Sequence, residues 1–214
     1  MKATSIHNDL LHTMEDSINI TDRFTQSYVR NDQIIPFGQA ETHLYFLIEG
    51  TVKIYLYHEN GTRSIIHFAQ AGDILGELSL LGVEEQSKEV IAQSNCTCIV
   101  VPRDKHEQLL LNLAFTRALN VYLAQKLTDR TFRLTHALNY PMINRLAAFI
   151  LFAENDGIYH ESATEIAEYL STSYRHLMHT FKQLRELKLL SKIGTSYKIM
   201  DRRRLEAYAL DIQY

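Results

Sequence analysis

The pattern of apolar and polar positions divides the chain into three stretches. In the first, between about residues 30 and 101, short apolar or β-branched runs occur at 44–48, 52–57, 64–68 and 97–101. Glycines separate these runs at intervals of roughly 8 to 12 residues, and the Asn60-Gly61 pair is a strong hairpin signal. This pattern predicts an antiparallel β-sandwich or barrel.

The second stretch is helical, because the chain from 103 to 140 contains neither glycine nor proline. Leucines recur there at mostly four-residue steps: Leu119, Leu123, Leu127, Leu134 and Leu138. A helix over 112–138 would be about 40 Å long at 1.5 Å per residue. It either lies along its own β-domain or pairs with its copy in a second subunit. We favour pairing, since a small domain cannot cover so long a helix on all sides.

The third stretch, from about residue 139, predicts two short helices joined by a turn. Ser162 and Glu165 fit the capping box with which a helix begins, and a serine- and threonine-rich turn at 171–173 leads into a second helix. The apolar positions of that second helix lie about 200° from its basic ones, on the opposite face. The apolar set is Leu177, Phe181 and Leu184, and the basic set is Arg175, His179 and Lys182. This amphipathic pair predicts a helix-turn-helix.

A short hairpin around Gly194 follows the second helix, and Lys192, Thr195 and Ser196 on it are available for phosphate. Residues 171–204 contain nine basic and two acidic residues, a local charge of +7 in a chain whose net charge is −3. A basic stretch in an acidic chain favours contact with a polyanion.

Composition agrees with a globular protein of one large or two modest domains, because 46% of the 214 residues are hydrophobic and 22% charged. The amino terminus has no continuous apolar stretch of the secretory type, and no run approaches the roughly 20 residues that span a bilayer. We therefore expect a cytoplasmic protein without a membrane partner. Cys96 and Cys98 point the same way from one strand, which favours two small buried thiols over a disulfide.

The succession of β-roll, long helix and winged helix-turn-helix resembles the Crp-Fnr family of bacterial transcription regulators over essentially the whole chain. The similar segments are HLYFLIEGTVKIYLYHENGTRSIIHFAQAGDILGELSLLG, NRLAAFILFA and TEIAEYLSTSYRHLMHTFKQLRELKLL. The resemblance implies an α+β fold in three parts. These are a double-stranded β-helix (jelly-roll) sensor domain at 1–111, a dimerisation helix at 112–138 and a winged helix-turn-helix domain at 139–214.

The segment that resembles the family's effector site departs from its pattern. In relatives that bind cyclic AMP, a Gly-Glu-Leu segment leads to an arginine that neutralises the phosphate and to a neighbouring hydroxyl, and here Gln86 and Ser87 align with that pair. Enclosing a phosphate without a cationic partner costs several kcal/mol, and each 1.4 kcal/mol is about tenfold in affinity. We therefore expect no cyclic AMP cofactor, unless Lys88 substitutes, and leave another small effector open. The candidate pocket residues are Gly76, Glu77, Leu78, Gln86, Ser87 and Thr131.

The second helix of the helix-turn-helix also differs from the family's pattern. The resemblance implies that Ser173 caps this helix and contacts phosphate, and that Tyr174, Arg175 and His179 occupy base-reading positions. An arginine can grip guanine through O6 and N7, which is worth about 1–3 kcal/mol of discrimination. The complete set of candidate DNA-binding residues is Ser173, Tyr174, Arg175, His179, Lys182, Lys192, Thr195 and Ser196.

These features predict a DNA-binding transcription regulator that acts as a homodimer on a palindromic operator, with RNA polymerase as a further expected partner. One alternative is an effector-binding module whose C-terminal domain docks a protein. Another is a metal enzyme of the cupin type that would use His43, His58 and His67, although these lack a His-x-His pair with a matching carboxylate.

Overall fold

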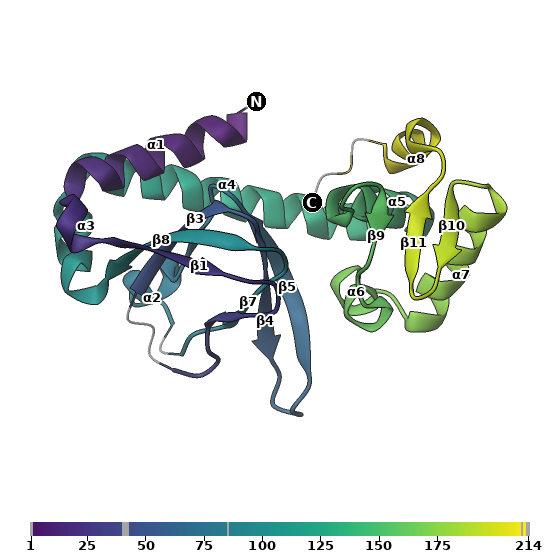
Figure 1. Ribbon diagram of the computed structural model, residues 1–214, viewed down its shortest axis with the longest axis horizontal. Helices are drawn as coiled ribbons and strands as arrows, with labels where there is room; N and C mark the ends of the chain where they lie inside the picture. Colours follow the sequence, from purple (N-terminus) through teal and green to yellow (C-terminus); the bar gives the residue numbers. More distant parts are fainter. Residues whose placement is uncertain (1, 40–42, 85, 211, 213–214) are drawn as a thin grey trace. The chain divides into compact units, whose positions relative to one another are not determined.

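The computed structural model describes residues 2–39, 43–84, 86–210 and 212, except for the side chains of residues 2–9, 20, 133 and 136–138. The chain divides into two compact units, residues 1–125 and 126–214. Figure 1 shows both units, with labels on their larger helices and strands.

The N-terminal unit contains two four-stranded antiparallel sheets, which confirms the predicted β-roll. One sheet has the strand order β1-β8-β3-β6 and the other has the order β2-β7-β4-β5. The strands are β1 (Phe24–Tyr28), β2 (Gln33–Ile35), β3 (His43–Glu49), β4 (Thr51–Tyr57), β5 (Arg63–Gln70), β6 (Ile74–Leu75), β7 (Glu89–Ala92) and β8 (Cys96–Pro102). Asn60 and Gly61 lie in the turn between β4 and β5, where the side-chain oxygen of Asn60 accepts from the Thr62 amide at 3.0 Å.

Apolar side chains that alternate along the strands form one core of the β-roll. Its buried members are Ile34, Ile35, Tyr45, Leu47, Val52, Ile54, Ala69, Leu75, Val90, Ala92, Cys96, Cys98 and Val100. Gly50 turns the chain from β3 to β4 with a φ of +92°, and a Cβ on it would lie 2.3 Å from the Asn95 carbonyl oxygen. Only glycine allows this close approach, because any side chain would collide with the backbone.

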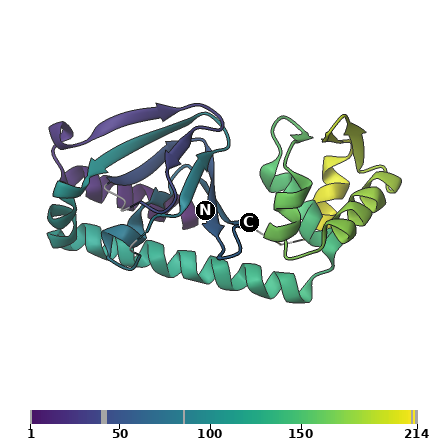
Figure 2. The same ribbon diagram turned by 90° about the horizontal axis from the view of Figure 1, so that it is seen from below.

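A layer of helices covers the opposite face of the sheet that contains β3 and β8 (Figure 2). Leu44 and Phe46 lie in the core on this face, whereas their neighbours Tyr45 and Leu47 lie in the first core, because side chains alternate along a strand. The buried members of this second core are Leu10, Met14, Ile18, Leu44, Phe46, Ile74, Leu80, Val101, Leu109, Phe115, Leu119 and Tyr122. The helices of the unit are α1 (Lys2–Ser17), η1 (Ile20–Asp22), α2 (Glu77–Leu80), η2 (Arg103–Lys105), α3 (His106–Leu111) and the first part of α4 (Leu113–Asn139).

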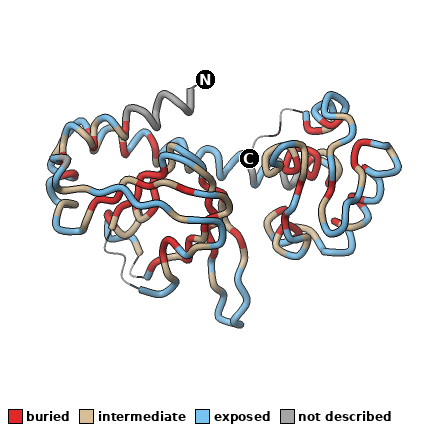
Figure 3. The backbone as a smooth tube through the Cα atoms, viewed as in Figure 1, coloured by how far each residue is buried: buried red, intermediate tan, exposed pale blue. Residues whose placement is uncertain are grey.

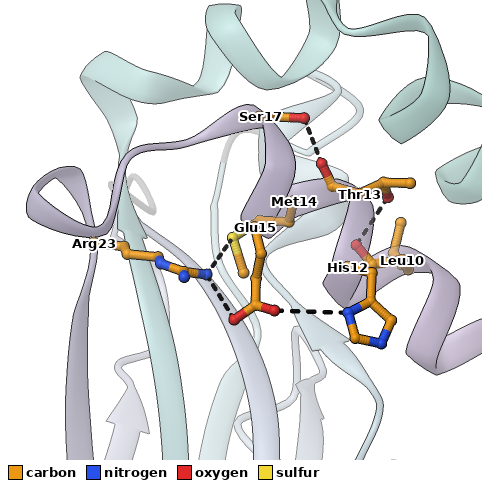
Figure 4. A network of polar contacts seen from close by, with 7 residues as sticks. All are labelled: Leu10, His12, Thr13, Met14, Glu15, Ser17 and Arg23. Carbon is orange, nitrogen blue, oxygen red and sulfur yellow. Dashed lines mark hydrogen bonds and ion pairs between the residues drawn. The ribbon is translucent and has the colours of Figure 1, made fainter.

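Helix α1 is an element for which the sequence analysis made no prediction. Leu10, Met14 and Ile18 are spaced by four residues and are buried in the second core. Figure 4 shows the polar contacts at its end, where the Arg23 guanidinium lies 3.0 Å from the Glu15 carboxylate and 3.6 Å from the Met14 sulfur. These contacts fasten α1 to the chain that leads into β1.

Helix α4 corresponds to the helix expected at 112–138. It begins after Asn112, whose side-chain oxygen accepts from the Phe115 amide at 3.0 Å. The Tyr122 hydroxyl accepts from the Ile74 amide and donates to the Asp73 carboxylate, both at 3.1 Å. Burial, followed by the nearby Asp73 charge, raises the pKa of Tyr122 well above its ordinary value, so the hydroxyl stays protonated.

The C-terminal unit is a small helical domain with a three-stranded antiparallel sheet of order β10-β11-β9. Its elements are α5 (Met142–Ala153), β9 (Ile158–Tyr159), α6 (Ala163–Tyr169), α7 (Tyr174–Glu186), β10 (Leu190–Ile193), β11 (Ser196–Ile199) and α8 (Arg202–Ala209). Phe149, Phe181 and Tyr159 are fully buried in this unit, with the Phe149 and Phe181 rings 6.2 and 5.8 Å from the ring of Tyr159. The predicted helix-turn-helix and hairpin are both present.

We predict that Tyr122→Phe lowers the free energy of unfolding of the N-terminal unit by about 1–3 kcal/mol, because the buried Ile74 amide and Asp73 carboxylate each lose a hydrogen-bond partner. Urea unfolding followed by circular dichroism measures this loss. Tyr174→Phe is the matched control, since Tyr174 is exposed and should change stability by no more than about 0.5 kcal/mol. Equal effects of the two substitutions would contradict the role given to the Tyr122 hydroxyl.

Candidate functional site

Helices α6 and α7 are joined by a turn, and a side chain of α5 bonds to the backbone at the end of α6. The backbone of Ser171 has a φ of +50°, and the Thr172 amide donates to the Ala167 carbonyl at 2.8 Å. The buried Arg145 of α5 donates from its guanidinium to the Leu170 carbonyl at 2.6 Å. These bonds satisfy backbone groups at the end of α6 and set the direction in which α7 leaves the turn.

The two faces of α7 differ as the sequence pattern predicted. Leu177, Phe181 and Leu184 are buried, whereas Tyr174, Arg175, His179 and Lys182 are exposed; Figure 3 shows α7 with both buried and exposed positions. Arg175 makes no hydrogen bond or ion pair with any residue that the structure describes. Lys182 lies 3.7 Å from Glu186 one turn later, a solvent-exposed pair of little energetic weight. The exposed face is therefore available to a ligand.

The two predicted helix caps have different outcomes. The Ser173 hydroxyl accepts from the His176 amide at 3.2 Å, which confirms Ser173 as the cap of α7. Ser162 is the first residue before α6, but its side chain makes no capping hydrogen bond. The predicted capping hydrogen bond from the Ser162 side chain is thus wrong, although the predicted start of the helix is right. A side-chain rotamer decides whether such a bond forms, and the residue pattern does not specify it.

The hairpin of β10 and β11 packs against α7 through aromatic stacking. The rings of Tyr197 and Phe181 are parallel within 9° and 4.3 Å apart. Lys192 and Thr195 are exposed on this hairpin, and the Ser196 hydroxyl pairs with His160 Nδ1 at 2.7 Å. His160 follows β9, and only the pairing of β9 with β11 brings it to the hairpin. Sequence reasoning missed it because an isolated histidine carries no spacing signal.

Of the residues expected to form an effector pocket, Ser87 uses its polar groups within the protein, whereas Gln86 does not within the described part of the chain. Gly76, with a φ of +89°, precedes Glu77, which is buried, and Leu78, which is half-buried at the start of α2. The buried Ser87 donates from its hydroxyl to the Pro36 carbonyl at 2.5 Å, and its amide donates to the Gln39 carbonyl. Gln86 is exposed at the surface.

Two acidic residues described in this segment, Glu84 and Glu89, are also paired. Lys88 forms an ion pair with Glu84, and the buried Glu89 forms one with Arg63. Glu89 also accepts from Gln33 at 2.9 Å and from the Tyr57 hydroxyl at 3.0 Å, so three strands donate to one carboxylate. Sequence reasoning missed this network, because it depends on strand pairing.

The leucines assigned to a subunit interface separate into two groups along α4. Leu119 is 1% exposed in the second core of its own chain, and Leu123 packs against the same core. Leu119 is therefore corrected from an interface residue to a core residue, because the β-roll already covers it. Leu127 and Leu134 are 67% and 66% exposed. The side chain of Leu138 lies outside the described residues.

Comparisons with known proteins agree with this geometry. Residues 25–112 match the cyclic nucleotide-binding domain family, and residues 144–208 match the Crp-like helix-turn-helix domain family. The regulatory protein YeiL of Escherichia coli O157:H7 is 36% identical over 186 residues, which cover 86% of this chain and 85% of YeiL. The chain belongs to the Crp-Fnr family of transcription regulators.

More distant Crp-Fnr proteins share the same architecture. The cAMP-activated global transcriptional regulator CRP of Salmonella typhimurium strain LT2 is 23% identical over 178 residues, covering 78% of this chain and 85% of CRP. A putative crp/fnr regulator from Eubacterium rectale has a similar fold, with a TM-score of 0.74 at 15% identity over 91% of this chain and 96% of its own. FixK2 from Bradyrhizobium japonicum has a TM-score of 0.65 at 19% identity, over 89% and 98% of the two chains.

Membership of the Crp-Fnr family decides against the enzyme alternative, because the family consists of transcription regulators. His58 Nε2 pairs with Ser64 Oγ at 2.9 Å. Within the described ranges, His, Cys, Asp and Glu side chains form no group of three that could hold a metal ion. No helix in the part of the chain that the structure describes has the length and hydrophobicity needed to cross a bilayer.

Both cysteines of this Crp-Fnr chain are buried free thiols, as predicted. Burial raises the pKa of Cys98 to about 12, and burial also raises the pKa of Cys96, whose sulfur donates to the Thr51 carbonyl at 3.2 Å. A thiol reacts as its thiolate, so neither cysteine lies in a reactive environment.

We predict that Ser173→Ala lowers the free energy of unfolding of the DNA-binding unit by about 1 kcal/mol, because the His176 amide loses its capping acceptor. Ser162→Ala is the matched control and should cost less, since Ser162 makes no capping bond. Equilibrium denaturation of the two full-length variants measures the difference. Equal losses would show that the two serines cap their helices alike.

Proposed function

We propose that this transcription regulator is a homodimer that binds an inverted-repeat DNA sequence through α7 and does so without cyclic AMP. The observation that carries the proposal is the exposed polar face of α7, which presents Tyr174, Arg175 and His179 opposite the buried apolar residues. A helix held by its apolar face in this way can enter the major groove with its amino-terminal end first.

Charge and hydrogen bonding support separate roles for α7 and the hairpin in DNA binding. Arg175 is unpaired among the described residues, so its guanidinium is available to O6 and N7 of a guanine. Lys192 and Thr195 on the hairpin are exposed and offer an ammonium and a hydroxyl to phosphates. In this scheme α7 reads bases, and the hairpin positions the protein on the backbone of the duplex.

Dimerisation would follow from the exposed part of α4. One recognition helix contacts only a few base pairs, so useful specificity requires two of them. Leu127 and Leu134 expose two thirds of their surface on α4, and burial against a second copy would remove that apolar area from water. Two-fold symmetry then gives half-sites about 34 Å apart on the DNA. A regulator bound at such an operator acts on RNA polymerase, which we include as a proposed partner.

Independence from cyclic AMP is supported by the ion pairs that already occupy two cations described on this part of the β-roll, Lys88 and Arg63. Gln86 replaces the arginine that neutralises the cyclic phosphate in cyclic AMP-binding relatives. Lys88 is paired with Glu84, and Arg63 with the buried Glu89. A cyclic phosphate would have to displace one of these carboxylates, so its binding would be weak. Gly76 then shapes the turn before α2, and Glu77 is a structural residue at the start of that helix.

The test of the proposed function is selection of binding sites from random duplex DNA, with the oligomeric state measured by size exclusion and light scattering. A dimer that enriches an inverted repeat equally with and without cyclic AMP is the expected result. A monomer that enriches no repeat, and that captures a protein in place of DNA, would overturn the proposal. If the inverted repeat is enriched only when cyclic AMP is present, the proposed independence from cyclic AMP is wrong and the proposed DNA-binding dimer stands.

We predict different effects of two substitutions on the selected operator. Arg175→Ala should relax selectivity at one guanine by about 1–3 kcal/mol, because it removes a base contact. Lys192→Ala should weaken binding to all DNA sequences similarly and lower the slope of log K against log salt concentration by about one unit. Arg203→Ala, which removes an exposed charge of the same sign on α8, is the control. Fluorescence anisotropy at several salt concentrations measures all three, and a uniform loss for Arg175→Ala would reverse its assignment.

A further inference from the structure

The outer face of α4 carries residues at regular intervals of seven. Leu113, Asn120, Leu127 and Leu134 follow one another at this spacing, and all four are exposed, the leucines by 63%, 67% and 66%. Figure 3 shows the exposed positions along this helix. A repeat of seven is typical of helices that pair in a left-handed coiled coil. We call this row the heptad row.

A second row completes the pattern four residues further along. Arg117, Ala124 and Thr131 follow Leu113, Asn120 and Leu127 at this spacing and are also exposed. Steps of four and three residues place both rows on one face of the helix. Ala124 and Thr131 are small, which allows close approach of a second helix, and the long side chain of Arg117 can extend to solvent.

Asn120 is the polar member of the heptad row, and other polar side chains of α4 differ from it in their hydrogen bonds. Thr131 donates from its hydroxyl to the Leu127 carbonyl at 3.0 Å, and Asn139 donates to the Thr135 carbonyl at 2.8 Å. These groups are satisfied on their own helix. The Asn120 amide makes no hydrogen bond with any residue in the described part of the chain.

Burial of this amide in a dimer would require a new partner. An unsatisfied buried amide costs about 1–3 kcal/mol. In a parallel two-fold pair of helices, each residue of the heptad row faces the same residue of the other chain. One Asn120 can then donate from its NH₂ group to the side-chain carbonyl of the other, so the pair supplies the missing bond.

We propose that Asn120 pairs with the Asn120 of a second copy and thereby specifies a parallel, two-stranded, in-register dimer. The inference rests on the proposed homodimer and adds the residue that selects its register. A slip of one heptad would move one helix by about 10 Å against the other and would bury each Asn120 against a leucine. Such a slip would also displace the two copies of α7 and spoil the spacing of the operator half-sites.

Disulfide cross-linking of full-length single-cysteine additions tests the pairing. Asn120→Cys and Leu127→Cys should each form a covalent dimer under mild oxidation, because equal positions of the heptad row face each other. Gln125→Cys, exposed on another side of α4, should not. Background from the native cysteines is low, since Cys96 and Cys98 are buried and their pKa values are raised.

The role in register is tested with Asn120→Leu, in which the row becomes entirely apolar. This variant should form a dimer at least as stable as the parent but lose its single register. We therefore expect mixed Leu127→Cys and Leu134→Cys chains to cross-link to each other in the Asn120→Leu background and not in the parent. The parent protein should bind an operator with correctly spaced half-sites with high affinity, and the Asn120→Leu variant should bind it more weakly.

The outcomes separate this inference from the proposed dimer. If Leu127→Cys cross-links but Asn120→Cys does not, the dimer stands and the asparagine pair is wrong. If Asn120→Leu retains only in-register cross-links, Asn120 does not select the register. If neither Leu127→Cys nor Asn120→Cys cross-links and light scattering shows a monomer, the proposed homodimer itself fails.

Discussion

The arrangement of this protein depends on the burial of one face of α4 against the β-roll. Phe115, Leu119 and Tyr122 lie in the same core as side chains of α1 and β3, and the Tyr122 hydroxyl adds bonds to the segment that leads into α2. A helix packed through one face leaves its opposite face exposed. The leucines spaced by seven residues lie on that exposed face, so the proposed pairing is a consequence of what the β-roll has already covered.

The same principle acts on α7. Leu177 and Phe181 are buried, and the stacking of Tyr197 on Phe181 fixes the hairpin beside the helix. Because these contacts use the apolar side, the polar side with Arg175 is left exposed, as the proposed DNA contact requires. In the β-roll, by contrast, the buried Glu89 carboxylate has donors from three strands of its own chain. The buried Ser87 hydroxyl likewise donates within the chain, to the Pro36 carbonyl.

Much of this architecture could be predicted, and the failures have physical reasons. Alternating strands, the Asn60-Gly61 hairpin and the two faces of α7 depend on local periodicity, which a sequence displays directly. Helix α1 was missed because its apolar stripe, Leu10 and Met14 with Ile18 directly after the helix, is short and gains its stability from packing. The assignment of Leu119 to an interface was wrong because periodicity shows that a residue is apolar and not which surface covers it.

The sequence by itself determined the fold class, the order of the domains, the Crp-Fnr resemblance and the amphipathic character of α4 and α7. Tertiary structure decided which partner each group meets: Ser173 caps its helix and Ser162 does not, His160 reaches Ser196, and Glu89 gathers donors from three strands. Periodicity is a property of neighbouring residues and is visible in one dimension. Hydrogen bonds and burial between distant residues depend on strand pairing and rotamers, which exist only after the chain has folded.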